Sequence, residues 1–139
     1  MLNYNFLRSN ELVRVLIVED DDSLRNLYRI ALKLKGHDVI GAAGDGEEAV
    51  DMFKNFSIKP DVILMDHRMP GKNGLETTKE IMKMDGKSKI IFASADKSMR
   101  EEAISLGARS FKPKPFSLEK LCSNIDKAMN GEYFKLRNI

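Results

Sequence analysis

The sequence predicts an α/β protein in which five parallel strands form one sheet and helices cover both faces. Two observations support this prediction. Short apolar runs alternate with amphipathic segments five times along the chain, which is typical of strand–helix units in a parallel sheet. In addition, the runs at residues 13–18, 62–65 and 90–93 are almost continuously apolar, as expected of central strands covered on both sides.

The first strand, residues 13–18, leads through an acidic run into a helix that is expected to begin near Asp22. Gly36 suits the left-handed conformation that often ends a helix, and a second strand at residues 38–42 follows. The residues of this helix that share one face at helical spacing are expected to point inward: Leu24, Leu27, Tyr28, Ala31 and Leu34.

Asp45 and Glu48 have the spacing of a capping box, so the second helix is expected to begin there. Pro60 breaks the chain before the third strand, residues 62–65, and residues 69–74 have the composition of a loop. The third helix follows this loop and ends at Gly86. The residues of these two helices that are expected to face inward are Ala49, Val50, Phe53, Phe56, Leu75, Ile81 and Met82.

The fourth strand is expected at residues 90–93, and Ser98 with Glu101 predicts a capping box for a fourth helix that ends before Gly107. The fifth strand, residues 109–113, contains Pro113, which cannot donate to a ladder and therefore favours an edge position. The short second strand contains Gly41 and fits the other edge. These constraints give the strand order 2-1-3-4-5. The fifth helix begins at Ser117, and its inward residues are expected to be Leu118, Leu121, Ile125 and Met129.

The composition limits the class of protein. A chain of 139 residues is typical of one domain, and 42% hydrophobic with 32% charged residues indicates a globular protein. The net charge of +2 gives no argument for nucleic-acid binding. A single cysteine, Cys122, excludes an internal disulfide and favours a cytoplasmic location. No apolar run approaches the roughly 20 residues that a membrane helix needs, so no membrane partner is expected.

Polar side chains follow the ends of four expected strands: Glu19 and Asp20, Asp66, Ser94, and Lys114. In a parallel sheet these ends meet at one edge, where ligand sites form at the point of strand-order reversal. Clustered carboxylates repel one another unless a cation compensates them, and Mg²⁺ prefers oxygen ligands. A lysine and a hydroxyl suit phosphate oxygens, and a carboxylate can accept a phosphoryl group. The sequence therefore predicts a site for a divalent cation and a phosphoryl group.

Each of these residues also has a purely structural explanation. The acidic run at residues 19–22 could be a solvated helix start, Asp66 could be a cap, and Lys114 could be a surface residue. Packing alone would explain Phe111, and His67 is expected to be a loop residue. The joint placement of the polar residues at strand ends favours the functional interpretation.

Four separated motifs resemble the signature of the response-regulator receiver domains of two-component signalling. They are Val18-Glu19-Asp20-Asp21, Asp66-His67-Arg68-Met69-Pro70-Gly71, Ser94-Ala95 and Lys114-Pro115-Phe116. The resemblance covers about residues 12–130, and the motifs occur in the right order on the right elements. The chain is similar to single-domain regulators of the chemotaxis type, and this resemblance implies a flavodoxin-like fold. The order 2-1-3-4-5 is a known property of such regulators, so it is not independent of the resemblance.

The resemblance implies a role for each acidic residue. Asp66 would be the phosphoacceptor. Asp20 and Asp66 would bind Mg²⁺ directly, together with the backbone carbonyl of Arg68, while Glu19 would act through water.

The resemblance also implies how the phosphoryl group is held and sensed. Ser94 and Lys114 would contact the phosphoryl oxygens. Phe111 matches the aromatic position of the switch that Ser94 starts. The Lys114–Pro115 bond matches a peptide bond that is often cis in the family, which is accessible because proline follows.

The expected function is that of a phosphorylation-activated switch. Asp66 would accept a phosphoryl group from a sensor histidine kinase or a phosphotransfer protein in a Mg²⁺-dependent reaction. The protein would act on an unidentified output protein through the fourth helix, fifth strand and fifth helix, and would be no enzyme beyond its own phosphorylation and dephosphorylation. Arg68 and Asp96, each two residues beyond a site residue, are expected to pair across the crevice and tune the phosphoryl lifetime.

Two alternatives remain open. An aspartyl-phosphate phosphatase also uses an aspartate at a strand end, but it would need a second aspartate where this chain has Arg68. The expected division is an N-terminal extension (1–11), a receiver domain (12–130) and a C-terminal tail (131–139). Because the tail could begin a linker helix, the chain could also be a receiver module cut from a longer regulator with an output domain.

Overall fold

The computed structural model describes residues 12–130, and the expected N-terminal extension and C-terminal tail lie outside these residues. Five parallel strands form one sheet in the order β2-β1-β3-β4-β5, which confirms the predicted flavodoxin-like topology. The strands are β1 (Arg14–Val18), β2 (Asp38–Ala43), β3 (Val62–Asp66), β4 (Lys89–Ser94) and β5 (Ser110–Pro113). The helices are α2 (Asp22–Leu34), α3 (Gly46–Asn55), α4 (Gly74–Met84), the short 3₁₀ helix η1 (Lys97–Met99), α5 (Arg100–Ser105) and α6 (Leu118–Met129).

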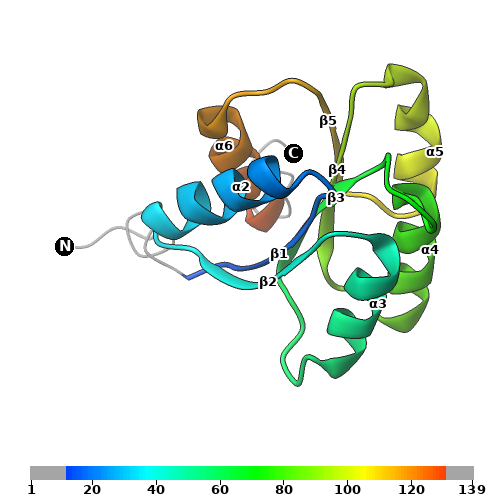
Figure 1. The fold of residues 1–139 in the computed structure, drawn as a ribbon, viewed down its shortest axis with the longest axis horizontal. Helices are drawn as coiled ribbons and strands as arrows, with labels where there is room; N and C mark the ends of the chain where they lie inside the picture. Colours follow the sequence, from blue (N-terminus) through cyan, green and yellow to red (C-terminus); the bar gives the residue numbers. More distant parts are fainter. Residues whose placement is uncertain (1–11, 131–139) are drawn as a thin grey trace, which may run out of the picture.

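The helices form one layer on each side of the sheet. Figure 1 shows α2 and α6 on one face and α3, α4 and α5 on the other. Successive side chains of a strand point to opposite faces, so Val15 and Ile17 of β1 pack beneath α2 and α6, whereas Leu16 and Val18 pack toward the other layer. All four side chains have 0% exposure. Burying a side chain of this size stabilises the fold by about 1.5–3 kcal/mol.

The two edges of the sheet lie where the sequence predicts them. Pro113 ends β5, which pairs with β4 alone, and β2 pairs with β1 alone. The register between β1 and β2 shifts between Val15 and Leu16, so that Leu16 lies opposite Gly41. A Cβ atom at Gly41 would lie 3.0 Å from the Phe56 ring and 3.1 Å from the Leu16 side chain. Glycine therefore lets α3 approach the edge strand closely.

The face that α2 buries differs from the predicted one. Tyr28 is buried as expected, but Leu27 is 47% and Leu34 is 83% exposed, while Leu32, which was not expected inward, has 0% exposure. Apolar residues occupy more than half of the helix circumference, so their spacing alone does not specify which flank meets the sheet. The prediction for Leu27 and Leu34 is wrong because the sheet contacts the flank that carries Leu32.

The predicted helix start at Ser98 and Glu101 is also wrong. Asp96 takes the capping role instead: its carboxylate accepts hydrogen bonds from the Ser98 backbone N–H at 3.0 Å and from the Ser98 hydroxyl at 2.6 Å. This arrangement starts the 3₁₀ helix η1, and α5 begins after Met99 without a side-chain cap. The cap position of α5 is Met99, one residue after Ser98, so the Ser98 side chain does not cap that helix.

The predicted capping box at Asp45 is half right. The Asp45 carboxylate accepts from the Glu48 backbone N–H at 2.8 Å, but the Glu48 carboxylate accepts from the Gly44 N–H at 3.4 Å. A complete capping box occurs at α4, where Asn73 and Glu76 accept from each other's backbone N–H groups. Asn73 and Glu76 have the spacing of such a box, but the turn-forming composition of residues 69–74 favours a loop there, so the box is not predicted.

No helix within residues 12–130 is long and apolar enough to span a membrane.

Candidate functional site

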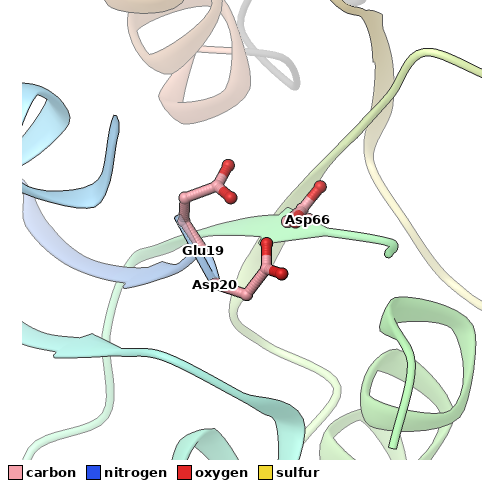
Figure 2. Close-up of side chains that lie close together, drawn as sticks. All are labelled: Glu19, Asp20 and Asp66. Atoms are coloured by element: carbon pink, nitrogen blue, oxygen red, sulfur yellow. The ribbon is translucent and has the colours of Figure 1, made fainter. Parts of the chain in front are cut away.

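Three carboxylates meet at the carboxyl edge of the sheet. Glu19 and Asp20 follow β1, and Asp66 ends the neighbouring strand β3, so the parallel pairing brings them together (Figure 2). Each of the three offers a carboxylate oxygen within 4.8 Å of the others. They line a pocket of about 320 Å³, whose other walls are Asp21, Leu24, Arg68, Ser94, Ala95 and Lys114. The sequence prediction that strand-end residues form one cluster is therefore confirmed.

Lys114 neutralises part of this charge. Its Nζ donates to Glu19 Oε1 at 2.7 Å and to Asp66 Oδ1 at 3.0 Å. The backbone places it there, because the Lys114 N–H donates to the Ser94 carbonyl at 2.9 Å and so continues the pairing of β5 with β4. The peptide bond from Lys114 to Pro115 is cis, as the resemblance implied.

Burial dominates the electrostatics of the cluster. It raises the pKa of Glu19 to about 7, although the hydrogen bond from Lys114 acts in the opposite direction. Burial likewise raises the pKa of Asp66 above its usual value, and Lys114 again opposes the shift. For Lys114 itself, burial would lower the pKa, but the hydrogen bonds to Glu19 and Asp66 outweigh it and raise the pKa. The site therefore holds more negative charge than its single lysine compensates.

Glu19 and Asp20 are adjacent in sequence but lie in different environments. Glu19 is 2% exposed, and its second oxygen, Oε2, accepts from the Asp21 backbone N–H at 3.2 Å. Its backbone carbonyl accepts from the Arg25 guanidinium at 2.9 Å, which ties the β1–α2 turn to the helix. Asp20, in contrast, is exposed at the mouth of the pocket.

The β3–α4 loop is held against Asp66 by a close backbone approach. The Gly74 N–H donates to the His67 carbonyl at 2.9 Å. A Cβ atom at Gly74 would lie 2.3 Å from the Asp66 carbonyl oxygen, which leaves no space for a side chain. From the sequence, Gly74 is expected in a loop, and this contact is not predictable because it depends on the angle at which α4 meets β3.

The other predicted residues lie around the same pocket or next to it. Ser94 is 3% exposed, and its Oγ accepts from the Asp96 backbone N–H at 3.1 Å. Arg68 lines the pocket. Phe111 is half-buried, and its ring centroid lies 6.2 Å from that of Phe92 in the core.

Arg68 and Asp96 do not form the expected ion pair. Within residues 12–130 no salt bridge joins them, because the Asp96 carboxylate is engaged by Ser98. Hydrogen bonds from Ser98 are the main cause that lowers the pKa of Asp96, and the charge of Arg68 contributes less. The expected ion pair is therefore not formed in this structure, and the joint effect of Arg68 and Asp96 on the phosphoryl lifetime stays a prediction.

The donor set fits a hard divalent cation. The three converging groups are carboxylates, which are oxygen ligands of the kind that Mg²⁺ prefers. Asp20 is exposed and Asp66 lines the pocket, so a cation has access from solvent. The raised pKa values of Glu19 and Asp66 show that added positive charge would be stabilising here.

The comparisons with known proteins assign the class. The family model of the response regulator receiver domain matches residues 15–126, which is most of the chain. The chain therefore belongs to the receiver-domain family of two-component signalling, a family of signalling modules and not of conventional enzymes.

Two of the similar relatives are chemotaxis proteins. The chain is 40% identical to a chemotaxis protein CheY of Thermotoga maritima over 116 residues, which cover 82% of this chain and 95% of the relative. It is 36% identical to CheY of Bacillus subtilis, with 84% and 98% of the two chains covered.

Two similar solved structures contain Mg²⁺ together with a beryllium fluoride. The CheX-CheY-BeF₃-Mg²⁺ complex of Borrelia burgdorferi contains a chain 28% identical to this one, with a TM-score of 0.80 and 84% and 89% of the chains covered. TrrA of Thermotoga maritima, in complex with Mg²⁺-BeF, is 32% identical, with a TM-score of 0.74 and coverage of 84% and 99%.

Proposed function

We propose that this protein is a phosphorylation-controlled switch in which Asp66 is the phosphoacceptor. The observation that carries the proposal is the position of Asp66: its buried carboxylate lies within 4.8 Å of two other carboxylates and accepts a hydrogen bond from Lys114. A carboxylate oxygen of Asp66 would attack phosphorus as the bond from phosphorus to the donor's imidazole nitrogen breaks. The product is an acyl phosphate on Asp66 and a free histidine on the donor.

The donor is proposed to be a sensor histidine kinase or a phosphotransfer protein. Receiver-domain membership supports this partner. A cytoplasmic location is proposed with it, because lone Cys122 suits a reducing compartment.

We propose that Asp20, Asp66 and the backbone carbonyl of Arg68 hold Mg²⁺ directly, with Glu19 acting through water. The convergence of the three carboxylates supports this assignment. When bound, the metal supplies positive charge that neutralises phosphoryl oxygens in the loose transition state. Glu19 fits the indirect role because both of its carboxylate oxygens already accept hydrogen bonds from Lys114 and Asp21.

Lys114 and Ser94 are proposed to hold the transferred group. The Lys114 ammonium already lies 3.0 Å from Asp66 Oδ1, so a phosphoryl group added there would meet it at once. Ser94 ends the neighbouring strand and lines the same pocket. Its hydroxyl accepts from Asp96 N–H and keeps its own proton for donation to a phosphoryl oxygen.

The output surface is proposed to be α5, β5 and α6. Ser94 would move toward the phosphoryl group, and Phe111, half-buried next to Phe92, would then turn further inward. The group adds about −1.5 to −2 charge, which is enough to bias two packings that differ by a few kcal/mol. An output protein, whose identity is open, would dock on this surface.

Residues 12–130 are proposed to act as the receiver, flanked by the extension (1–11) and the tail (131–139). A receiver that forms part of a longer regulator is the second candidate. It is favoured by relatives such as the transcriptional regulatory protein TrcR of Mycobacterium tuberculosis, which is 36% identical but matched over only 44% of its length.

Phosphorylation with a small acyl-phosphate donor tests the proposal. Wild-type protein should gain one phosphoryl group in the presence of Mg²⁺, as measured by intact-protein mass spectrometry, and none in the presence of a chelator. Asp66→Asn should gain none. Asp61→Asn, which alters an aspartate at the opposite end of β3, is the matched control and should label like wild type. Equal labelling of wild type and Asp66→Asn would contradict the assignment.

A further inference from the structure

We infer that Tyr28 and Phe116 are positioning residues that hold Lys114 in the acidic site through an aromatic stack between α2 and the β5–α6 loop. The inference rests on the proposed role of Asp66 as phosphoacceptor, because Lys114 acts on that carboxylate. It gives a role to two residues that had none from the sequence: Tyr28, which was expected only in the core, and Phe116, which was only part of a motif.

Lys114 needs such support because its side chain is long and flexible. The backbone segment that joins it to α6 is short, so contacts in that segment can fix its position. The lysine ammonium ends a flexible four-carbon stem, so its position depends on how firmly the backbone is held. On one side, the Lys114 N–H is bonded to the Ser94 carbonyl at the end of β4. On the other side, only Pro115 and Phe116 separate it from Ser117, which caps α6. Phe116 is therefore the aromatic anchor between the lysine and the helix.

Phe116 packs against helix α2. The Phe116 and Tyr28 rings are stacked, with centroids 5.8 Å apart and an interplanar angle of 6°. Tyr28 is 5% exposed and lies on the buried face of α2. Leu24, one turn earlier on the same helix, lines the acidic pocket. One helix face thus contacts both the pocket and the loop that carries Lys114.

A second contact fixes Phe116 from β5. The Lys112 ammonium lies over the Phe116 ring, 5.8 Å from its centroid, and donates to Asn124 Oδ1 of α6 at 3.0 Å. Phe116 therefore touches α2 and β5 at once. Cation–π and stacking contacts of this kind are directional, so they restrict the ring more than apolar burial alone would.

The phenol of Tyr28 also lies close to the charges of the site. Burial raises the pKa of Tyr28 to about 12, and the charge of Lys114 is the next largest influence, followed by those of Glu19 and Asp66. The stack therefore connects the wall formed by β1 and α2, which holds Glu19, to the wall formed by β5 and α6, which holds Lys114. Losing either ring would release the loop and move the ammonium away from Asp66.

The test uses the rate at which an acyl-phosphate donor labels the protein at saturating Mg²⁺. Phe116→Leu and Tyr28→Leu keep an apolar side chain, so the core stays filled, but remove the stack. Each should slow labelling by about ten- to a hundredfold, the loss typical of a catalytic group misplaced by about 1 Å. The conservative variants Tyr28→Phe and Phe116→Tyr keep both rings, so each should label at a rate near that of the wild type.

The same changes in a Lys114→Ala background separate positioning from general stability. If the stack acts through Lys114, Phe116→Leu should cause no further loss there. Equal loss in both backgrounds, or no loss in either, would overturn the inference. Phe56→Ala is the matched control: it removes a half-buried ring from the opposite helix layer and should leave the labelling rate unchanged. Labelling of Asp66→Asn would instead refute the proposed function, so the two failures are distinguishable.

Discussion

At the scale of single residues, the site is governed by the balance between three carboxylates and one ammonium. Lys114 bridges Glu19 and Asp66, yet burial still raises the pKa of Glu19 to about 7. The sequence placed all of these residues at strand ends, so their convergence was predictable from topology. It did not predict that Lys114 would bind Glu19, because that contact depends on the path of the loop after β5.

The different environments of Asp20 and Glu19 lead to a prediction about metal affinity. Asp20 is exposed at the pocket mouth, whereas the oxygens of Glu19 are engaged by Lys114 and Asp21. Asp20→Ala should therefore weaken Mg²⁺ binding by about tenfold or more, and Glu19→Ala should weaken it less. A Mg²⁺ titration monitored by calorimetry or by NMR chemical shifts measures the affinity of both variants. Asp51→Ala, on the exposed surface of α3, serves as control, and a larger effect of Glu19→Ala would contradict the assignment of ligands.

At the scale of elements, strands were more predictable than the helix starts and helix faces. Strands β1, β3 and β4 are buried on both sides, and their apolar runs mark them in any context. Helix starts depend on which neighbouring polar side chain reaches the free N–H groups. Asp96 therefore displaced Ser98 from the expected cap, and Asn73 formed a capping box where the sequence indicated a loop.

The two helix starts differ in their expected contributions to stability. Asn73→Ala removes the side chain that accepts from the Glu76 N–H in the capping box and should lower the free energy of unfolding by about 1 kcal/mol. Ser98→Ala removes an exposed hydroxyl bonded to Asp96 and should change the free energy of unfolding by less than about 0.5 kcal/mol. Urea unfolding of both variants measures the difference. A larger cost for Ser98→Ala would mean that Ser98 stabilises the start of α5 after all.

At the scale of the whole molecule, the site lies where two helical layers and the reversal of strand order meet. The order 2-1-3-4-5 puts β1 and β3 side by side, so the acidic residues of both strands share one edge (Figures 1 and 2). This placement follows from the pattern of strands and helices. The Tyr28–Phe116 stack does not, because it joins residues 88 positions apart whose contact is decided by the packing of α2 against the β5–α6 loop.

The proposed output surface predicts where the molecule responds to activation. Beryllofluoride with Mg²⁺ should shift backbone amide resonances mainly in residues 94–120, which include α5, β5 and the start of α6. The reason is that Ser94 begins that segment, Lys114 lies within it, and both line the pocket that would hold the phosphoryl group. Two-dimensional NMR measures the changes, with residues 46–55 of α3 as the internal control. Changes concentrated in α2 would show that the signal leaves through another surface.

The most direct test of the central claim is to locate the phosphoryl group chemically. An acyl phosphate on aspartate is reduced by borohydride to homoserine, and peptide sequencing by mass spectrometry then identifies the position. After labelling with Mg²⁺ present, the account predicts reduction at Asp66, and at no other position of the described site. Reduction at Asp20 or Glu19, or an acid-stable phosphate on a serine such as Ser94, would contradict it.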